Sequence, residues 1–342
     1  MQASKMHRMT GVEERYLDLL KGCLTRYLFI DEEVEDLEGG WKATAFSPVR
    51  LLLNRRGLRV VRTGGNREHR ALGLTWPKCA ETMVGLRRLD NVQACVTDVI
   101  RRGVPGDLIE TGVWRGGTTI FMRAILAAYG DTGRRVWVAD SFQGLPIPNP
   151  SVYPADAVDP FEAVVAAVGC ELASEAPGRP LVRGLRSGWR IAERLKLGRQ
   201  LVRDLKERHN ATPASGYEPW NAPVTTLDRL VVSMEEVKAN FAKYGLLDSQ
   251  VEFLPGWFKD TLPAAPIEKL AVIRLDGDLY ESTMDALTNL YPKLSVGGWV
   301  IIDDYDCIDA CRLAVNHFRE AHGVTERIEP VDWTAICWQR QQ

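Results

Sequence analysis

The chain has 342 residues, of which 45% are hydrophobic, and this apolar content is enough for one large α/β domain with additions. Its net charge of −2 gives no overall attraction to nucleic acid or to anionic membranes, and no apolar run approaches the length of a membrane span. The seven cysteines form no C-x-x-C pair and the N-terminus lacks the apolar core of a signal peptide, so we expect reduced thiols and a cytoplasmic protein.

The first predicted elements are two helices. Residues 10–40 contain VEERYLDLLKGCLTRYLF, in which apolar residues recur at the spacing of an amphipathic helix. A second helix is predicted over residues 80–102, and it leads into the first core strand. We place a domain boundary near residue 70, between an N-terminal helical extension (1–70) and a main domain (71–342).

Residues 106–146 predict half of a nucleotide-binding α/β unit. GDLIETGVWRGGTTIFMRAIL indicates a buried strand that ends at Glu110, then a glycine-rich turn and a helix. RVWVADSFQGLP indicates the next strand, which ends at Asp140. An acid in that position is placed to bind the two hydroxyls of a ribose.

The glycine turn narrows the choice of ligand. Gly112, Gly116 and Gly117 let the backbone approach a ligand closely, but their spacing is neither that of a dinucleotide fingerprint nor that of a phosphate loop. Glu110, just before the turn, would repel a pyrophosphate and would suit a cationic group such as the amino group of S-adenosylmethionine. The turn therefore favours a methyl donor, with NAD and ATP as the alternatives.

A long connection follows this unit. Residues 187–209 predict a helix with one apolar stripe, which either packs on the domain or a second subunit, or forms a lid that shapes the acceptor pocket. Residues 210–223 are rich in Pro, Gly, Asn and Ser and predict a loop. Tyr217 and Trp220 in this loop either stack on a ligand or hold the loop in place.

Two apolar runs further along the chain end in pairs of aspartates. AVIRL is followed by Asp276 and Asp278, and WVII is followed by Asp303 and Asp304. Such runs predict buried strands, and strand ends carry the chemistry of open α/β sheets. Four acids that converge there would repel one another unless a hard divalent cation, for which carboxylates are good ligands, lay between them. The alternative is two acidic turns on opposite edges of a sheet.

The remaining pattern completes an α/β fold. Ser233, three residues before Glu236, predicts a capping box at the start of a helix. Strands and helices alternate from there to a final strand at AICWQR. This order predicts a doubly wound, mostly parallel sheet with an antiparallel C-terminal strand.

Six blocks, in the same order, resemble the macrocin O-methyltransferase family: ETGVWRGG, VADSFQGLP, FLPGWFKDTLP, LDGDLYESTMDAL, LYPKLSVGGWVIIDDY and DWTAICWQR. The resemblance covers roughly residues 70–155 and 230–340. It implies a Rossmann-like class I methyltransferase fold that uses S-adenosylmethionine and Mg²⁺. It also implies an enzyme that methylates a sugar hydroxyl of a glycosylated natural product in antibiotic biosynthesis.

The resemblance assigns roles residue by residue. The implied magnesium ligands are Asp276, Asp303 and Asp304. Asp278 matches the proposed general base, so Asp278 and Asp276 are the implied catalytic residues. The positions matched to the donor-binding loop are Glu110, Thr111, Gly112 and Gly116. Asp140 and Ser141 match the ribose-binding position, and Gly256, Trp257 and Phe258 match a loop near the adenine.

The family resemblance also bears on partners. Its members form dimers and tetramers, and their N-terminal segments help to form subunit contacts and to cover the active site, so a homo-oligomer is implied. The connection over about 160–225 is longer than in the family and is predicted to be an insertion. Two other functions stay open: a non-catalytic scaffold that kept the fold, and a different metal-dependent sugar-modifying enzyme.

Overall fold

The computed structural model describes residues 11–32, 34–36, 61–63, 65–77, 79–146, 148–157 and 230–342. The chain divides into two compact units, and the first comprises Met1–Val164 and Leu230–Gln342. The second unit, Val165–Arg229, lies outside the described residues.

Several predictions fall on the second unit. The helix over residues 187–209 and the loop with Tyr217 and Trp220 lie outside the described residues. The insertion over about 160–225 stays a prediction. The domain boundary near residue 70, which lies in the first unit, also stays a prediction.

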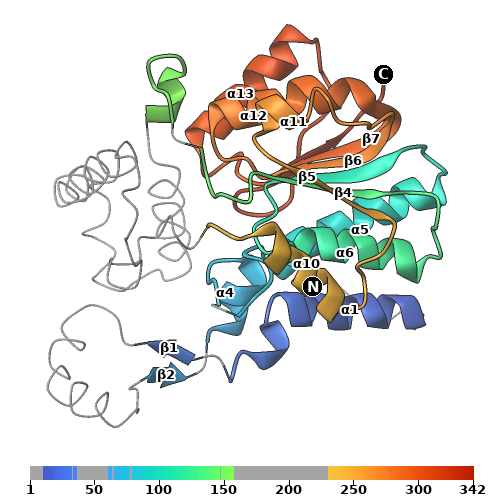
Figure 1. Ribbon diagram of the computed structural model, residues 1–342, viewed down its shortest axis with the longest axis vertical. Coiled ribbons are helices and arrows are strands. Elements are labelled where there is room, and N and C mark those ends of the chain that lie inside the picture. The colour runs from blue at the N-terminus through green and yellow to red at the C-terminus, as the bar shows by residue number, and fades with distance from the viewer. Residues whose placement is uncertain are drawn as a thin grey trace, which may run out of the picture. The chain divides into compact units, whose positions relative to one another are not determined.

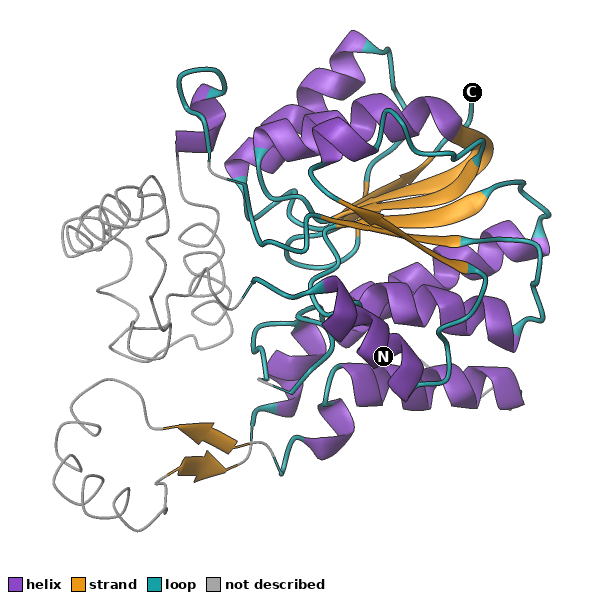
Figure 2. Ribbon diagram, in the orientation of Figure 1, coloured by secondary structure: helices purple, strands orange, loops and turns teal. Residues whose placement is uncertain are grey.

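A seven-stranded sheet, in the order β5-β4-β3-β6-β7-β9-β8, forms the centre of the first unit (Figures 1 and 2). Its strands are β3 (Asp107–Thr111), β4 (Val136–Asp140), β5 (Val251–Pro255), β6 (Leu270–Leu275), β7 (Leu294–Ile302), β8 (Glu329–Pro330) and β9 (Ile336–Gln339). Neighbours from β5 to β7 pair in parallel, whereas β9 is antiparallel to both β7 and β8. The predicted sheet with an antiparallel C-terminal strand is confirmed.

Different helices cover the two faces of this sheet (Figure 1). On one side lie α1 (Val12–Leu24), α4 (Arg67–Leu72), α5 (Leu86–Arg101), α6 (Gly117–Ala128) and α10 (Met234–Lys243); on the other lie α11 (Phe258–Thr261), α12 (Tyr280–Leu290) and α13 (Asp309–Ala321). Successive strand residues point to opposite faces, so Leu108 of β3 joins the core under α5 and α6 while Ile109 joins the core under α12 and α13. Burial on both faces explains why the central strands are almost entirely apolar.

The remaining elements are short. They are the 3₁₀ turns η1 (Tyr27–Phe29), η2 (Pro154–Ala157) and η6 (Tyr291–Lys293), and the antiparallel pair of β1 (Val34–Asp36) and β2 (Val61–Thr63). In the described part of the chain, no helix is long and apolar enough to cross a bilayer.

The structure agrees with the predicted start of one helix, α10, and differs from the predicted start of another, α5. The serine cap of the predicted capping box is confirmed at α10, where Ser233 Oγ accepts a bond from Glu236 N at 3.2 Å. The helix predicted from residue 80 begins instead at Leu86. Gly85 packs so tightly that an added Cβ would lie 2.3 Å from the carbonyl oxygen of Ala71, and the residues before it form a loop.

Candidate active site

The predicted glycine and aspartate motifs meet at the carboxyl ends of the central strands. The main-chain hydrogen bonds of the sheet continue past the strands: Asp276 N donates to Thr111 O at 2.9 Å, and Asp303 N donates to Leu275 O at 2.9 Å. The ends of β3, β6 and β7 therefore lie side by side. The alternative of two acidic turns on opposite sheet edges is wrong, because β6 and β7 are neighbours in the parallel sheet.

The glycine turn after β3 contacts the acidic loop after β6. Gly112 has a φ of 79°, and a Cβ added to it would lie 1.8 Å from the carbonyl oxygen of Asp276. Gly116 has a φ of 83° and caps α6, and a Cβ there would lie 2.8 Å from Val237 of α10. Both positions need glycine because the left-handed backbone and the close neighbours exclude a side chain.

Asp140 holds the shape of this turn. Its carboxylate accepts bonds from the backbone N–H groups of Val113 and Phe142, each at 2.8 Å. Burial raises the pKa of Asp140, and these N–H bonds oppose that rise. Ser141 donates its hydroxyl to Gly144 O at 2.8 Å, which closes the turn after β4. Both predicted ribose-site residues thus lie beside the glycine turn.

The predicted adenine loop lies at the same edge of the sheet. Gly256, with a φ of 133°, donates its N–H to Asp140 O at 2.9 Å. Trp257 is the N-cap of α11, and Phe258 begins that helix. The Phe258 ring would meet a Cβ added to Gly277 at 3.5 Å, so this loop also borders the acidic loop.

Glu110 is buried rather than directed into open space. Its side chain is only 1% exposed, and its two carboxylate oxygens accept bonds from the Arg274 guanidinium and the Thr119 hydroxyl. Burial raises the pKa of Glu110 to about 7, although Arg274 opposes the rise. A contact of Glu110 with the donor's amino group stays a prediction, and in this structure protein groups already occupy its oxygens.

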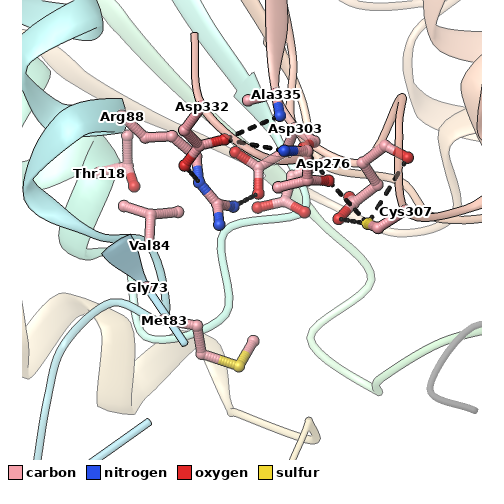
Figure 3. Close-up of polar contacts among 12 residues, drawn as sticks. Gly73, Met83, Val84, Arg88, Thr118, Asp276, Asp303, Cys307, Asp332 and Ala335 are labelled. Carbon is pink, nitrogen blue, oxygen red and sulfur yellow. Dashed lines mark hydrogen bonds and ion pairs between the residues drawn. The ribbon is translucent and has the colours of Figure 1, made fainter. Parts of the chain in front are cut away.

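Arg274 is the centre of a buried set of ion pairs that we call the arginine network: Glu110, Arg274, Asp303, Arg88 and Asp332. Arg274 of β6 bonds to Glu110, to Asp303 and, at 2.9 Å, to Asp276. Arg88 of α5 reaches Asp303 and, at 2.9 Å, Asp332, as Figure 3 shows. Burial alone would raise the pKa of Asp303, but the two guanidinium groups hold it below its ordinary value.

Sequence reasoning missed both arginines. A signal existed for Arg274, because a charge inside the apolar run AVIRL must find a partner within the sheet. Arg88 had none, since its partner Asp303 is 215 positions away in the chain.

Three acids form a separate group, the acidic trio of Asp276, Asp278 and Asp304. Each offers a carboxylate oxygen within 4.8 Å of the others, and among the described residues this is the set with metal-ligand spacing. Asp304 is 7% exposed, and its Oδ2 atom is buried without a hydrogen-bond partner. Burial and the neighbouring acids raise the pKa of Asp304. A cluster of carboxylates in which one buried oxygen has no hydrogen-bond partner fits a hard divalent cation.

The trio differs from the predicted metal set in one member. Asp276 and Asp304 come together as predicted, and Asp278, the predicted base, lies with them. Asp303, the third predicted ligand, has each oxygen bonded to an arginine. Its role as a metal ligand stays a prediction.

Comparisons with known proteins identify the class first. The fold is the Rossmann-like fold of S-adenosylmethionine-dependent O-methyltransferases. The solved structure of the O-methyltransferase NovP is similar to this chain, with a TM-score of 0.67 and 37% identity over 96% of this chain and 100% of that one.

The sequence comparisons then identify the family. The macrocin-O-methyltransferase (TylF) family matches residues 13–174 and 214–340. The 8-demethyl-8-(2,3-dimethoxy-alpha-L-rhamnosyl)-tetracenomycin-C 4'-O-methyltransferase of Streptomyces olivaceus is 44% identical over 94% of this chain and 91% of its own. The mycinamicin III 3''-O-methyltransferase of Micromonospora griseorubida is 38% identical over 98% of this chain and 99% of its own. The chain therefore belongs to the macrocin O-methyltransferase family, as its sequence motifs predicted.

Proposed function

We propose that this O-methyltransferase transfers the methyl group of S-adenosylmethionine to a sugar hydroxyl of a glycosylated natural product, with the help of Mg²⁺. Two similar enzymes are named for a rhamnosyl-tetracenomycin and for mycinamicin III, which supports a glycosylated acceptor in antibiotic biosynthesis. The observation that carries the metal dependence is the acidic trio, with its partnerless Asp304 Oδ2, against the glycine turn.

The donor is proposed to bind along the glycine turn. Gly112 and Gly116 give this turn its left-handed backbone, and Asp140 has a carboxylate at the strand end where ribose hydroxyls bind in related α/β folds. Trp257 and Phe258 border the same edge and offer apolar surface for adenine. This placement would bring the donor next to the Asp276 loop.

The acceptor hydroxyl is proposed to be activated at the acidic trio. Asp276 and Asp304 would hold the Mg²⁺, and a divalent cation at this position would lower the pKa of the acceptor hydroxyl. Asp278, in the same group, would accept the proton as methyl transfer proceeds. The fixed loops around these residues would contribute by orientation, because an in-line displacement at a sulfonium carbon gains rate from alignment.

We further propose that the protein is a cytoplasmic homo-oligomer. Helix α1 packs Leu17, Leu20 and Leu24 into the core with α6. Its other side exposes apolar residues, with Val12 79% and Leu19 59% exposed. An apolar surface of this kind supports a subunit contact through the N-terminal extension.

Calorimetric titration with S-adenosylhomocysteine, with and without Mg²⁺, tests this function against the two alternatives. We expect a dissociation constant on the order of micromolar, followed by Mg²⁺-dependent methylation of a glycosylated acceptor. Absence of binding under both conditions would favour the scaffold alternative. Binding of the product analogue together with full turnover in a chelator would remove the role of the metal.

A further inference from the structure

Asp156 is a buried carboxylate that bonds to a helix far away in the chain. It belongs to η2, is 1% exposed, and accepts bonds from the backbone N–H groups of Tyr280 at 2.6 Å and Glu281 at 3.3 Å. These partners lie 124 and 125 positions further along the chain and form the first turn of α12. Asp156 therefore caps α12 from outside.

Helix α12 needs such an external cap. The first N–H groups of a helix have no partner within it, and a Ser, Thr, Asp or Asn at the N-cap normally supplies one. The N-cap of α12 is Leu279, whose side chain cannot accept a hydrogen bond. A carboxylate at this end also interacts favourably with the helix dipole.

The residue before this N-cap belongs to the acidic trio. Asp278 has a φ of 56°, a left-handed conformation that is uncommon outside glycine, although aspartate adopts it more readily than most other residues. Across it, Leu279 N donates to Gly277 O at 2.6 Å. A backbone in such a conformation persists only where its surroundings hold it on both sides.

Two sets of contacts hold the loop of residues 276–279. On the incoming side, Asp276 N bonds to Thr111 O of β3. On the outgoing side, Asp156 fixes the first turn of α12. Tyr153 directly precedes η2, and its ring centroid lies 5.8 Å from that of Tyr280, which adds a second contact to the same turn.

We propose that Asp156 is a positioning residue, which holds the 276–279 loop so that Asp278 faces Asp276 and Asp304. The proposal rests on the proposed function, because it assigns the work of the trio to metal binding and proton acceptance. Asp156 itself is buried against the start of α12 and would act through that helix end.

The test compares Asp156→Ala and Asp156→Asn with the wild-type chain, each titrated with Mn²⁺ by calorimetry and assayed for methyl transfer. Loss of both acceptors in Asp156→Ala should weaken Mn²⁺ binding and lower kcat by about 10-fold or more, as removal of residues that support metal ligands does. Asp156→Asn keeps one carbonyl oxygen that can accept a bond from the helix, so its Mn²⁺ affinity and kcat should lie between those of the wild-type chain and of Asp156→Ala. S-adenosylhomocysteine binding should stay unchanged, since the glycine turn is held by other groups.

A matched control is Asn66→Ala. Asn66 also caps a helix through two backbone N–H groups, those of Glu68 and His69, but it does so at α4. This variant should lose thermal stability without any change in Mn²⁺ affinity or kcat. Mn²⁺ affinity and kcat in Asp156→Ala that match those of Asn66→Ala would overturn the proposal. Absence of Mn²⁺ binding by the wild-type chain would instead refute the proposed function, so the two failures are distinct.

Discussion

Asp303 and Asp304 are neighbours in the chain, yet they lie in two regions with opposite electrostatics. Asp303 belongs to the arginine network, where two guanidinium groups hold its pKa below the ordinary value. Asp304 belongs to the acidic trio, where burial and other carboxylates raise its pKa. Both residues directly follow β7, so one dipeptide contributes to both regions.

The charges of the buried acids are balanced differently in the two regions. In the arginine network, buried acids are neutralised by the protein's own cations, which ties β3, β6, α5 and the β8–β9 turn together. In the acidic trio, Arg274 bonds to Asp276, but Asp304 Oδ2 is buried without a hydrogen-bond partner, so we expect a bound cation to supply the remaining neutralising charge. The first region is therefore expected to govern stability, and the second metal binding and turnover.

Asp278→Asn should give the largest effect on turnover. Loss of the proposed proton acceptor should reduce kcat by about 10²–10⁴-fold. Metal binding should survive, because Asp276 and Asp304 remain. Asp309→Asn, an exposed acid on α13 paired with Arg312, is the control and should behave as wild type. Unchanged turnover in Asp278→Asn would remove its role as base.

Asp303→Asn should break the arginine network. Two buried guanidinium groups would lose a shared partner, and removal of one member of a buried ion pair costs about 3–5 kcal/mol of unfolding free energy. Mg²⁺-dependent turnover should also fall, with donor binding largely kept. Denaturant unfolding measures the first effect. A stability equal to that of Asp304→Asn, which should lose little, would contradict the proposed division between the two regions.

The pH dependence of metal stabilisation tests the acidic trio. Burial and neighbouring charges raise the pKa of both Asp304 and Asp276. When the pKa of an acid is higher in the folded than in the unfolded protein, ionisation of that acid lowers the folding stability. The contribution of these two aspartates to the stability of the metal-free protein should therefore decrease as the pH rises through their folded pKa values. Because the cation needs deprotonated ligands, Mg²⁺ should raise Tm more at about pH 8 than at about pH 6. If Mg²⁺ raised Tm equally at both pH values, the acidic trio would not be the metal-binding site.

Cys307→Ala should give the smallest effect. The Cys307 thiol lies 3.5 Å from Asp304 Oδ1, on the opposite oxygen from the partnerless Oδ2. Its loss removes one weak bond to this carboxylate, worth about 0.5–1.5 kcal/mol, so Mn²⁺ affinity should change by less than about 10-fold. The thiol's other bonds, to Asp304 O and from the Thr334 hydroxyl, do not involve a ligand oxygen. Cys307→Ser keeps a donor and is the matched control. Complete loss of binding in the alanine variant would make the thiol itself a ligand.

Local patterns predicted much of this site. The glycine turn, Asp140 and the aspartates at strand ends follow from short motifs, since each is set by the strand and turn in which it lies. What escaped prediction depends on distant pairs, such as Arg88 with Asp303 and Asp156 with the start of α12. No local signal separates Asp303 from Asp304, because only the packed sheet decides which one meets the arginines.

The most direct test of the central account is a Mn²⁺ titration of the wild-type chain and of Asp304→Asn, followed by electron paramagnetic resonance. We predict a saturable site in the wild-type protein and its loss in the variant, with S-adenosylhomocysteine binding intact in both. A wild-type chain that binds no Mn²⁺, or a variant that binds it equally well, would contradict the assignment of the acidic trio as the metal centre.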